Sequence, residues 1–175
     1  MKRSLSPKTP EEIERLSRGG KILRTVLEDV ARLARPVVTG RMLDRAAEQQ
    51  LHSRGAEPSF KGYAPPGDRD PYPFALIVSK NSAVVHGVPD DVPFRDGDIV
   101  SLDLGCRYDG LYTDTALTIA IGRIPKNAET LLAVTKRALH AAIAIVRPGV
   151  TTGDIGATIQ RIVARAGFSV VRDLV

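Results

Sequence analysis

The sequence contains an internal repeat. The segment RPVVTGRMLDRAAEQQLHSRGA, which begins at Arg35, recurs as RPGVTTGDIGATIQRIVARAGF from Arg147, at an offset of about 112 residues. Both copies place a helical pattern before the Arg-Pro pair, a Thr-Gly turn after it, and a second helical pattern that closes at a glycine. Such a repeat predicts two copies of one α/β half. The alternative is a chance match, because helix-proline-turn-helix patterns are common.

The repeat also predicts how the chain is organised. The first half would occupy residues 1–123, and residues 124–175 would start the second half. By the same offset, the second half would end at about residue 235, well beyond Val175. We therefore expect a single α/β (α+β) domain whose first half is complete and whose second half is cut short.

Caps, apolar periodicity and turn residues predict the individual elements. Thr9, Pro10 and Glu12 form a capping-box pattern at the start of a helix that extends toward Pro36. A second helix is expected from residue 39 to residue 55. The other expected elements are, in chain order, a loop without regular structure over 56–74, strands over 75–79, 83–86, 99–104 and 111–121, helices over 127–146 and 154–166, and a strand over 168–171.

Composition limits the compartment and the partners. No apolar run approaches the eighteen or so residues of a membrane span, and the first residues show no apolar signal core. Cys106 is the only cysteine, so no intrachain disulfide can form. We expect a cytoplasmic globular protein with no membrane partner.

The net charge of +5 comes from Lys and Arg residues that are scattered among Asp and Glu residues along the sequence. The chain has few Phe and Tyr residues and no Trp. Nucleic-acid binding usually needs a concentrated basic patch, and for single strands also a stacking surface. We therefore expect a solvated basic surface and no specific nucleic-acid partner.

A predicted hairpin brings two acidic residues together. Asp103 and Asp114 lie on the strands that flank an Asp109-Gly110 turn, so their side chains fall opposite or diagonal on one face. Carboxylates roughly 5 Å apart repel each other unless a cation lies between them. The other face of the hairpin receives Val100, Leu102, Leu117 and Ile119.

A divalent metal would remove this repulsion. Oxygen donors suit Mn, Fe(II), Co or Zn, and paired metal ions can activate water and polarise a carbonyl. Two aspartates cannot saturate one such ion, so further ligands would have to come from elsewhere. The alternative is that both residues face water or cap a turn, as the neighbouring aspartates of this region do.

His86 ends the apolar run over residues 83–85, where a predicted strand meets a turn. Its imidazole could lie beside the aspartate hairpin and hydrogen-bond a substrate amide. The alternative is a histidine that is satisfied in the core. His52 and His140 lie in predicted helices, and we expect structural roles for both.

Several segments resemble one known family. They are KTPEEIERLSRGGKIL, PSFKGY, SKNSAVVHGVPDD, RDGDIVSLDLGCRYDGLYTDTALT and TTGDIGATIQRIVARAGFSVVRDLV. In this order they resemble type I methionine aminopeptidases of the M24 peptidase family over essentially the whole chain. The last segment is similar to the stretch that precedes a Gly-His-Gly-Ile-Gly motif in that family, and the sequence stops before this motif.

The resemblance implies a fold and a site. The fold would be the pseudo-twofold pita-bread structure. Asp103 and Asp114 would be metal ligands, and His86 would be the catalytic-site residue that contacts the substrate near the scissile bond. The cofactors would be two divalent metal ions (Co, Mn, Fe or Zn). The family's remaining ligands, one His and two Glu, belong to its second half. Tyr63 and Tyr72 are expected to line the methionine pocket, with a loop between them that is longer than the family pattern.

The resemblance also implies a function. The expected reaction is the removal of the N-terminal methionine from nascent proteins. The expected partners are nascent polypeptide N-termini, with the ribosome as a further candidate, and the complete protein would be a monomer. Catalysis by residues 1–175 alone is in doubt, because they hold only part of the ligand set. The alternatives are an Xaa-Pro aminopeptidase or prolidase-like enzyme, and a non-catalytic pita-bread module that binds a peptide, the ribosome or another chain.

Overall fold

The structure is a computed structural model that describes residues 6–67 and 70–172. The chain divides into two compact units, Met1–Arg123 and Ile124–Val175. Among the described residues, the first unit contains two helices and four strands, and the second contains two helices.

Helix α1 (Pro10–Leu33) opens with the predicted capping box. The Thr9 side chain accepts a hydrogen bond from the Glu12 N–H at 3.2 Å, and the Glu12 carboxylate accepts one from the Thr9 N–H at 2.9 Å. The helix ends ahead of Pro36, because a residue that precedes proline disfavours helical geometry. Its buried stripe consists of Gly19, Leu23, Val26, Leu27 and Val30.

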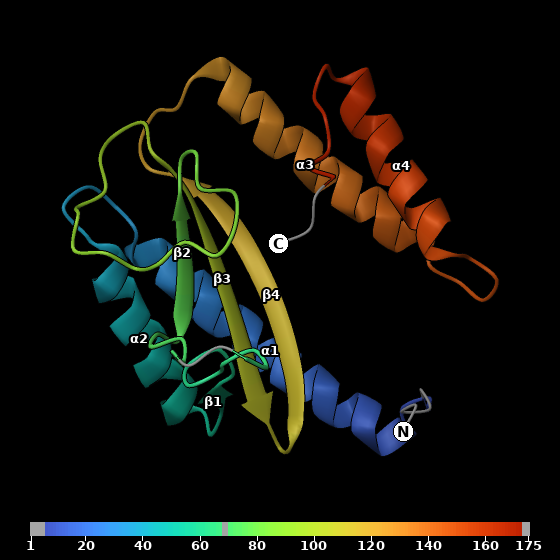
Figure 1. Ribbon diagram of the computed structural model, residues 1–175, viewed down its shortest axis with the longest axis horizontal. Helices are drawn as coiled ribbons and strands as arrows, with labels where there is room; N and C mark the ends of the chain where they lie inside the picture. The colour runs from blue at the N-terminus through green and yellow to red at the C-terminus, as the bar shows by residue number, and fades with distance from the viewer. Residues whose placement is uncertain (1–5, 68–69, 173–175) are drawn as a thin grey trace. The chain divides into compact units, whose positions relative to one another are not determined.

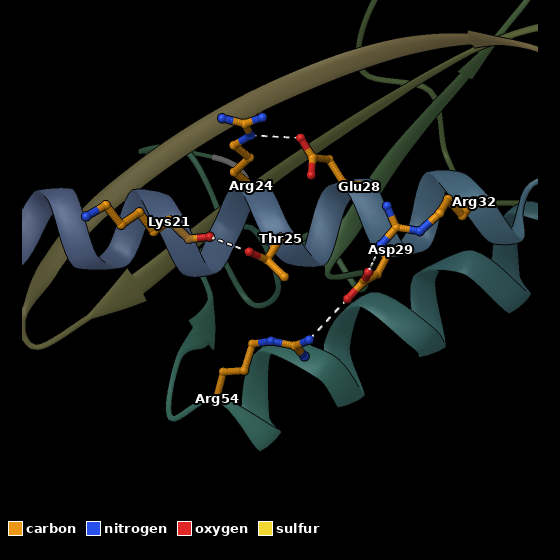
Figure 2. A network of polar contacts seen from close by, with 7 residues as sticks. All are labelled: Lys21, Arg24, Thr25, Glu28, Asp29, Arg32 and Arg54. Carbon is orange, nitrogen blue, oxygen red and sulfur yellow. Dashed lines mark hydrogen bonds and ion pairs between the residues drawn. The ribbon is translucent and has the colours of Figure 1, made fainter.

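Helix α2 (Gly40–Ser53) is capped by the Thr39 side chain and buries Leu43, Ala47 and Leu51. Figure 2 shows the polar network that joins it to α1. Asp29 of α1 pairs with Arg32 on its own helix and with Arg54 at the end of α2, the latter at 3.1 Å. Such solvated pairs contribute about 0–1 kcal/mol each, so they orient the helices while the apolar stripes hold them. Two further contacts stay within α1: Arg24 with Glu28, and Thr25 with the Lys21 carbonyl.

The sheet is built around one long strand. Strand β3 (Ile99–Tyr108) pairs antiparallel with β1 (Glu57–Pro58), β2 (Leu76–Lys80) and β4 (Leu111–Ala120). The β3–β4 turn is the predicted one: Asp109 and Gly110 have φ values of 47° and 79°, as tight hairpin turns require.

The two faces of the sheet differ. Helices α1 and α2 pack on one face (Figure 1), where β3 presents Val100, Leu102, Leu104 and Cys106 to the hydrophobic core. Because side chains alternate along a strand, Ser101, Asp103 and Gly105 point to the opposite face, which neither helix covers. The acids of the hairpin therefore lie on the open face of this unit.

Three expectations about strands were wrong. Residues 83–86 form a loop, because Asn81 and His86 adopt positive φ values of 55° and 56° that no strand allows. The stretch 56–74 contains the short strand β1, whose Pro58 is tolerated because β1 lies at a sheet edge. Residues 168–171 form no strand, since the described part of the second unit, 124–172, offers no other strand to pair with.

The second unit contains α3 (Lys126–Ala144) and α4 (Thr152–Arg165), which pack against each other. Helix α4 starts with a capping box in which the Asp154 N–H donates to the Thr151 side chain at 3.2 Å. Among the described helices of both units, none is long and apolar enough to cross a membrane.

Candidate functional site

The two hairpin acids lie diagonally across β3 and β4. Asp103 is paired with Ala116, and Asp114 is paired with Gly105. The two aspartates are therefore on the same face, in one of the two arrangements that the sequence predicted. The four apolar residues expected on the other face do share it, since Val100 is paired with Ile119 and Leu102 with Leu117.

The electrostatics of this pair are unfavourable. The Oδ1 atom of Asp103 is buried and has no hydrogen-bond partner in the described part of the chain. Burial and the charge of Asp114, partly offset by His86, together raise the pKa of Asp103 to about 6. Burial also raises the pKa of Asp114. A buried carboxylate oxygen without a hydrogen-bond donor costs free energy, so a bound cation would stabilise the ionised pair.

Gly105 lets the segment with Ser59 and Phe60 approach β3 next to this pair. A Cβ atom on Gly105 would lie 2.1 Å from the Ser59 Oγ and 3.2 Å from an Asp114 carboxylate oxygen. The Ser59 N–H donates to the Gly105 carbonyl at 3.0 Å. Only glycine allows this approach, which brings Phe60 to the edge of the acidic pair.

The acids form part of a pocket of about 710 Å³. All five residues that the sequence suggested line it: Tyr63, Tyr72, His86, Asp103 and Asp114. Burial, together with the charges of Asp44 and Asp103, raises the pKa of Tyr72 to about 12, so Tyr72 is a neutral phenol at physiological pH. The pocket thus joins three acids, with Asp70 as the third, and an imidazole to a wall of aromatic, proline and aliphatic side chains.

Sequence reasoning missed several pocket residues, among them Phe60, Ile77 and Val88. Ile77 could have been predicted, because it is paired with Asp103 in the β2–β3 register and shares its face. Phe60 and Val88 lie in the PSFKGY and HGVPDD segments, but no periodicity marks a loop residue as part of a pocket wall.

The described residues provide two candidate ligands for a metal centre. Within residues 6–67 and 70–172, no three His, Cys, Asp or Glu side chains come close enough to hold a metal ion. The orphaned Oδ1 of Asp103 and the diagonal carboxylate of Asp114 fit two oxygen ligands of a divalent cation. A complete centre would need further ligands.

Comparison with known proteins decides the family. Residues 14–175 match metallopeptidase family M24. This chain belongs to metallopeptidase family M24. The match agrees with the geometry, since paired carboxylates suit the divalent ions on which metallopeptidases depend.

Individual M24 proteins extend the comparison. The methionine aminopeptidase of Aquifex aeolicus is 38% identical over 161 residues, which cover 91% of this chain and 62% of that protein. The crystal structure of methionine aminopeptidase from Thermotoga maritima matches with a TM-score of 0.90 and 36% identity, over 97% of this chain and 66% of that one. The chain therefore spans less than two thirds of the length of these M24 relatives.

A third comparison concerns the fold alone. The Xaa-Pro dipeptidase from Bacillus anthracis matches with a TM-score of 0.78 at 24% identity, over 91% of this chain and 42% of that one. Together with the Thermotoga structure, it confirms the predicted α/β class and the pita-bread fold of M24 enzymes.

Proposed function

We propose that the full-length protein containing residues 1–175 is a metal-dependent methionyl aminopeptidase, which removes the N-terminal methionine from nascent proteins. One observation carries the proposal: Asp103, with its unpartnered Oδ1, and Asp114 share one face of the hairpin and line a pocket with apolar and aromatic walls. A peptidase for an N-terminal apolar residue needs these two features side by side.

Each pocket residue then has a role. Asp103 and Asp114 would hold divalent metal ions through their carboxylate oxygens. When bound, such ions supply Lewis acidity, which activates water and polarises the scissile carbonyl. His86, which lines the same pocket, would hydrogen-bond the substrate amide next to the bond that is cut. Phe60, Ile77, Tyr63 and Tyr72 would surround the methionine side chain and exclude water from it.

The resemblance to the same family also supports proposals about the metal ions, the oligomeric state and the location. We propose two metal ions, drawn from Co, Mn, Fe or Zn, and a monomer that acts in the cytoplasm on emerging polypeptide N-termini at the ribosome. The Thermotoga methionine aminopeptidase has the higher identity and TM-score, 36% and 0.90 against 24% and 0.78 for the Xaa-Pro dipeptidase, which favours methionine over Xaa-Pro substrates.

The test is a peptidase assay of the full-length natural polypeptide. After chelation and return of each candidate metal, we expect cleavage of Met-Ala-Ser and none of an Xaa-Pro dipeptide. Asp103→Ala and Asp114→Ala should abolish cleavage. Asp109→Asn is the matched control, because Asp109 lies in the exposed turn of the same hairpin and asparagine suits that turn.

Three outcomes would contradict the proposal. Preference for the Xaa-Pro dipeptide would favour a prolidase-like enzyme. Peptide binding without turnover would favour a non-catalytic module. Full activity of both alanine variants would show that the two aspartates are not metal ligands.

A further inference from the structure

Asp44 is a buried acid that lines no part of the pocket. It lies on α2 among the residues of the core, with 7% of its surface exposed. In residues 6–67 and 70–172, its polar partners are two backbone N–H groups, and no cation pairs with it. Because an acid is expensive to bury, its place on an otherwise apolar stripe suggests a specific task.

Those two N–H groups mark the end of the pocket loop. Asp44 Oδ1 accepts from the Ala75 N–H at 2.8 Å and from the Leu76 N–H at 3.0 Å. Leu76 is the first residue of β2, and the preceding residues 71–73 line the pocket. One carboxylate oxygen therefore fixes the point at which the pocket wall joins the sheet.

Tyr72 connects this anchor to the pocket. Its hydroxyl donates to the Leu76 carbonyl at 3.1 Å. Asp44 therefore binds the N–H of Leu76, and Tyr72 binds the carbonyl of the same residue. The backbone of Tyr72 is also tied to the opposite side of the loop, since its N–H donates to the Tyr63 carbonyl at 2.8 Å. The aromatic wall is thus anchored through Leu76 to α2.

Arg41 supports the same wall from the preceding turn of α2. Its guanidinium lies 4.9 Å from the centre of the Phe74 ring, within cation–π range. The Phe74 ring stands edge-on to Tyr72, with 5.7 Å between their centres. Residues three apart on a helix share a face, so Arg41 and Asp44 present one supporting surface to residues 72–76.

We propose that Asp44, assisted by Arg41, is a positioning residue that supports substrate binding by fixing Tyr72 in the pocket wall. This inference rests on the proposed function, because the wall is taken to bind the methionine side chain. Asp44 itself is not among the residues that line the pocket. The Ala75 and Leu76 amides need an acceptor oxygen on this side chain and not its negative charge.

The experiment compares Asp44→Ala with Asp44→Asn in the full-length protein. We expect Asp44→Ala to raise KM for Met-Ala-Ser roughly tenfold with kcat nearly unchanged, because uniform substrate binding is lost while the reacting groups stay in place. Asp44→Asn keeps an acceptor oxygen and should restore KM. Asp29→Ala is the control, since it removes an acid that also joins two elements but lies outside the pocket.

A second readout does not depend on catalysis. Amide hydrogen exchange of Ala75 and Leu76 should accelerate in Asp44→Ala and stay slow in Asp44→Asn and Asp29→Ala. If Asp44→Ala fails to fold, Arg41→Met replaces it, because the Arg41 side chain is 43% exposed and its loss should raise KM in the same direction.

The inference is overturned if Asp44→Ala leaves both amides protected, or if it changes KM no more than Asp29→Ala does. It is also overturned if Asp44→Asn is as impaired as Asp44→Ala. A wild-type protein that cleaves no methionyl peptide would contradict the proposed function instead, while the amide exchange would still decide whether Asp44 holds the wall.

Discussion

The Ser79 hydroxyl accepts a hydrogen bond from the Gly87 N–H at 3.0 Å. Ser79 is one of the few buried polar residues of the described chain, and the Gly87 carbonyl in turn accepts from the Val78 N–H at 3.0 Å. These two bonds dock the loop that carries His86 onto β2. His86 itself has a φ of 56°, a conformation that a non-glycine residue keeps only when its neighbours are fixed.

We predict that Ser79→Ala lowers kcat for Met-Ala-Ser by about tenfold, because His86 is then less well held near the scissile bond. Ser101→Ala is the matched control. Ser101 is paired with Ser79 across the β2–β3 ladder and bonds Thr118, not the His86 loop. Each change should cost about 1 kcal/mol of stability. Equal losses of kcat in both variants would contradict a role for Ser79 in placing His86.

A second prediction concerns pH. The pKa of Asp103 is raised to about 6 in the folded chain, so the folded state holds this proton more tightly than the unfolded state. Without metal, its contribution to stability is present below about pH 4 and is lost as pH rises through about 6. We expect Asp103→Asn to remove this loss and to stabilise the metal-free protein by about 1–2 kcal/mol at pH 7.

The measurement is chemical denaturation of the metal-free full-length protein in chelator at several pH values between 4 and 8. Wild type should lose stability across this range relative to Asp103→Asn. Parallel profiles for the two proteins would show that Asp103 is not strained in the folded state.

Metal binding gives a third prediction that needs no substrate. A cation held by Asp103 and Asp114 binds the folded state only, and it therefore raises the melting temperature as its concentration rises. We expect Mn or Co to stabilise wild type and Asp109→Asn, and to leave Asp114→Ala unchanged. Thermal scans of the three proteins at increasing metal concentration provide the measurement. An equal shift in Asp114→Ala would place the metal elsewhere.

The features that were best predicted from the sequence are those that local interactions determine. The capping box at Thr9, the Asp109-Gly110 turn and the shared face of Asp103 and Asp114 each follow from a few neighbouring residues. The apolar run over 83–85 looked like a strand, yet it is a loop because Gly87 docks on Val78 and Ser79, a contact that no periodicity reveals.

The same limit applies to the pocket. The family resemblance pointed to Tyr63, Tyr72 and His86, but Asp44 appeared in the sequence as one more residue of an amphipathic helix. Its task depends on the return of the chain to β2 some thirty residues later, at Ala75 and Leu76. Contacts between such distant residues are a product of the folded chain.

The last prediction compares two glycines. A Cβ atom on Gly105 would lie 2.1 Å from the Ser59 Oγ and 2.9 Å from the Phe60 ring. Gly105→Ala should therefore push the loop after β1 away from β3, destabilise the fold by about 2–4 kcal/mol and weaken metal binding at Asp114. Gly20 lies in α1, where a Cβ atom would meet nothing within 4 Å, so Gly20→Ala should stabilise the protein by about 0.5–1 kcal/mol. Denaturant unfolding of both variants measures these changes. A Gly105→Ala protein with wild-type stability and metal affinity would mean that the loop, and Phe60 with it, does not need this close approach to form the pocket.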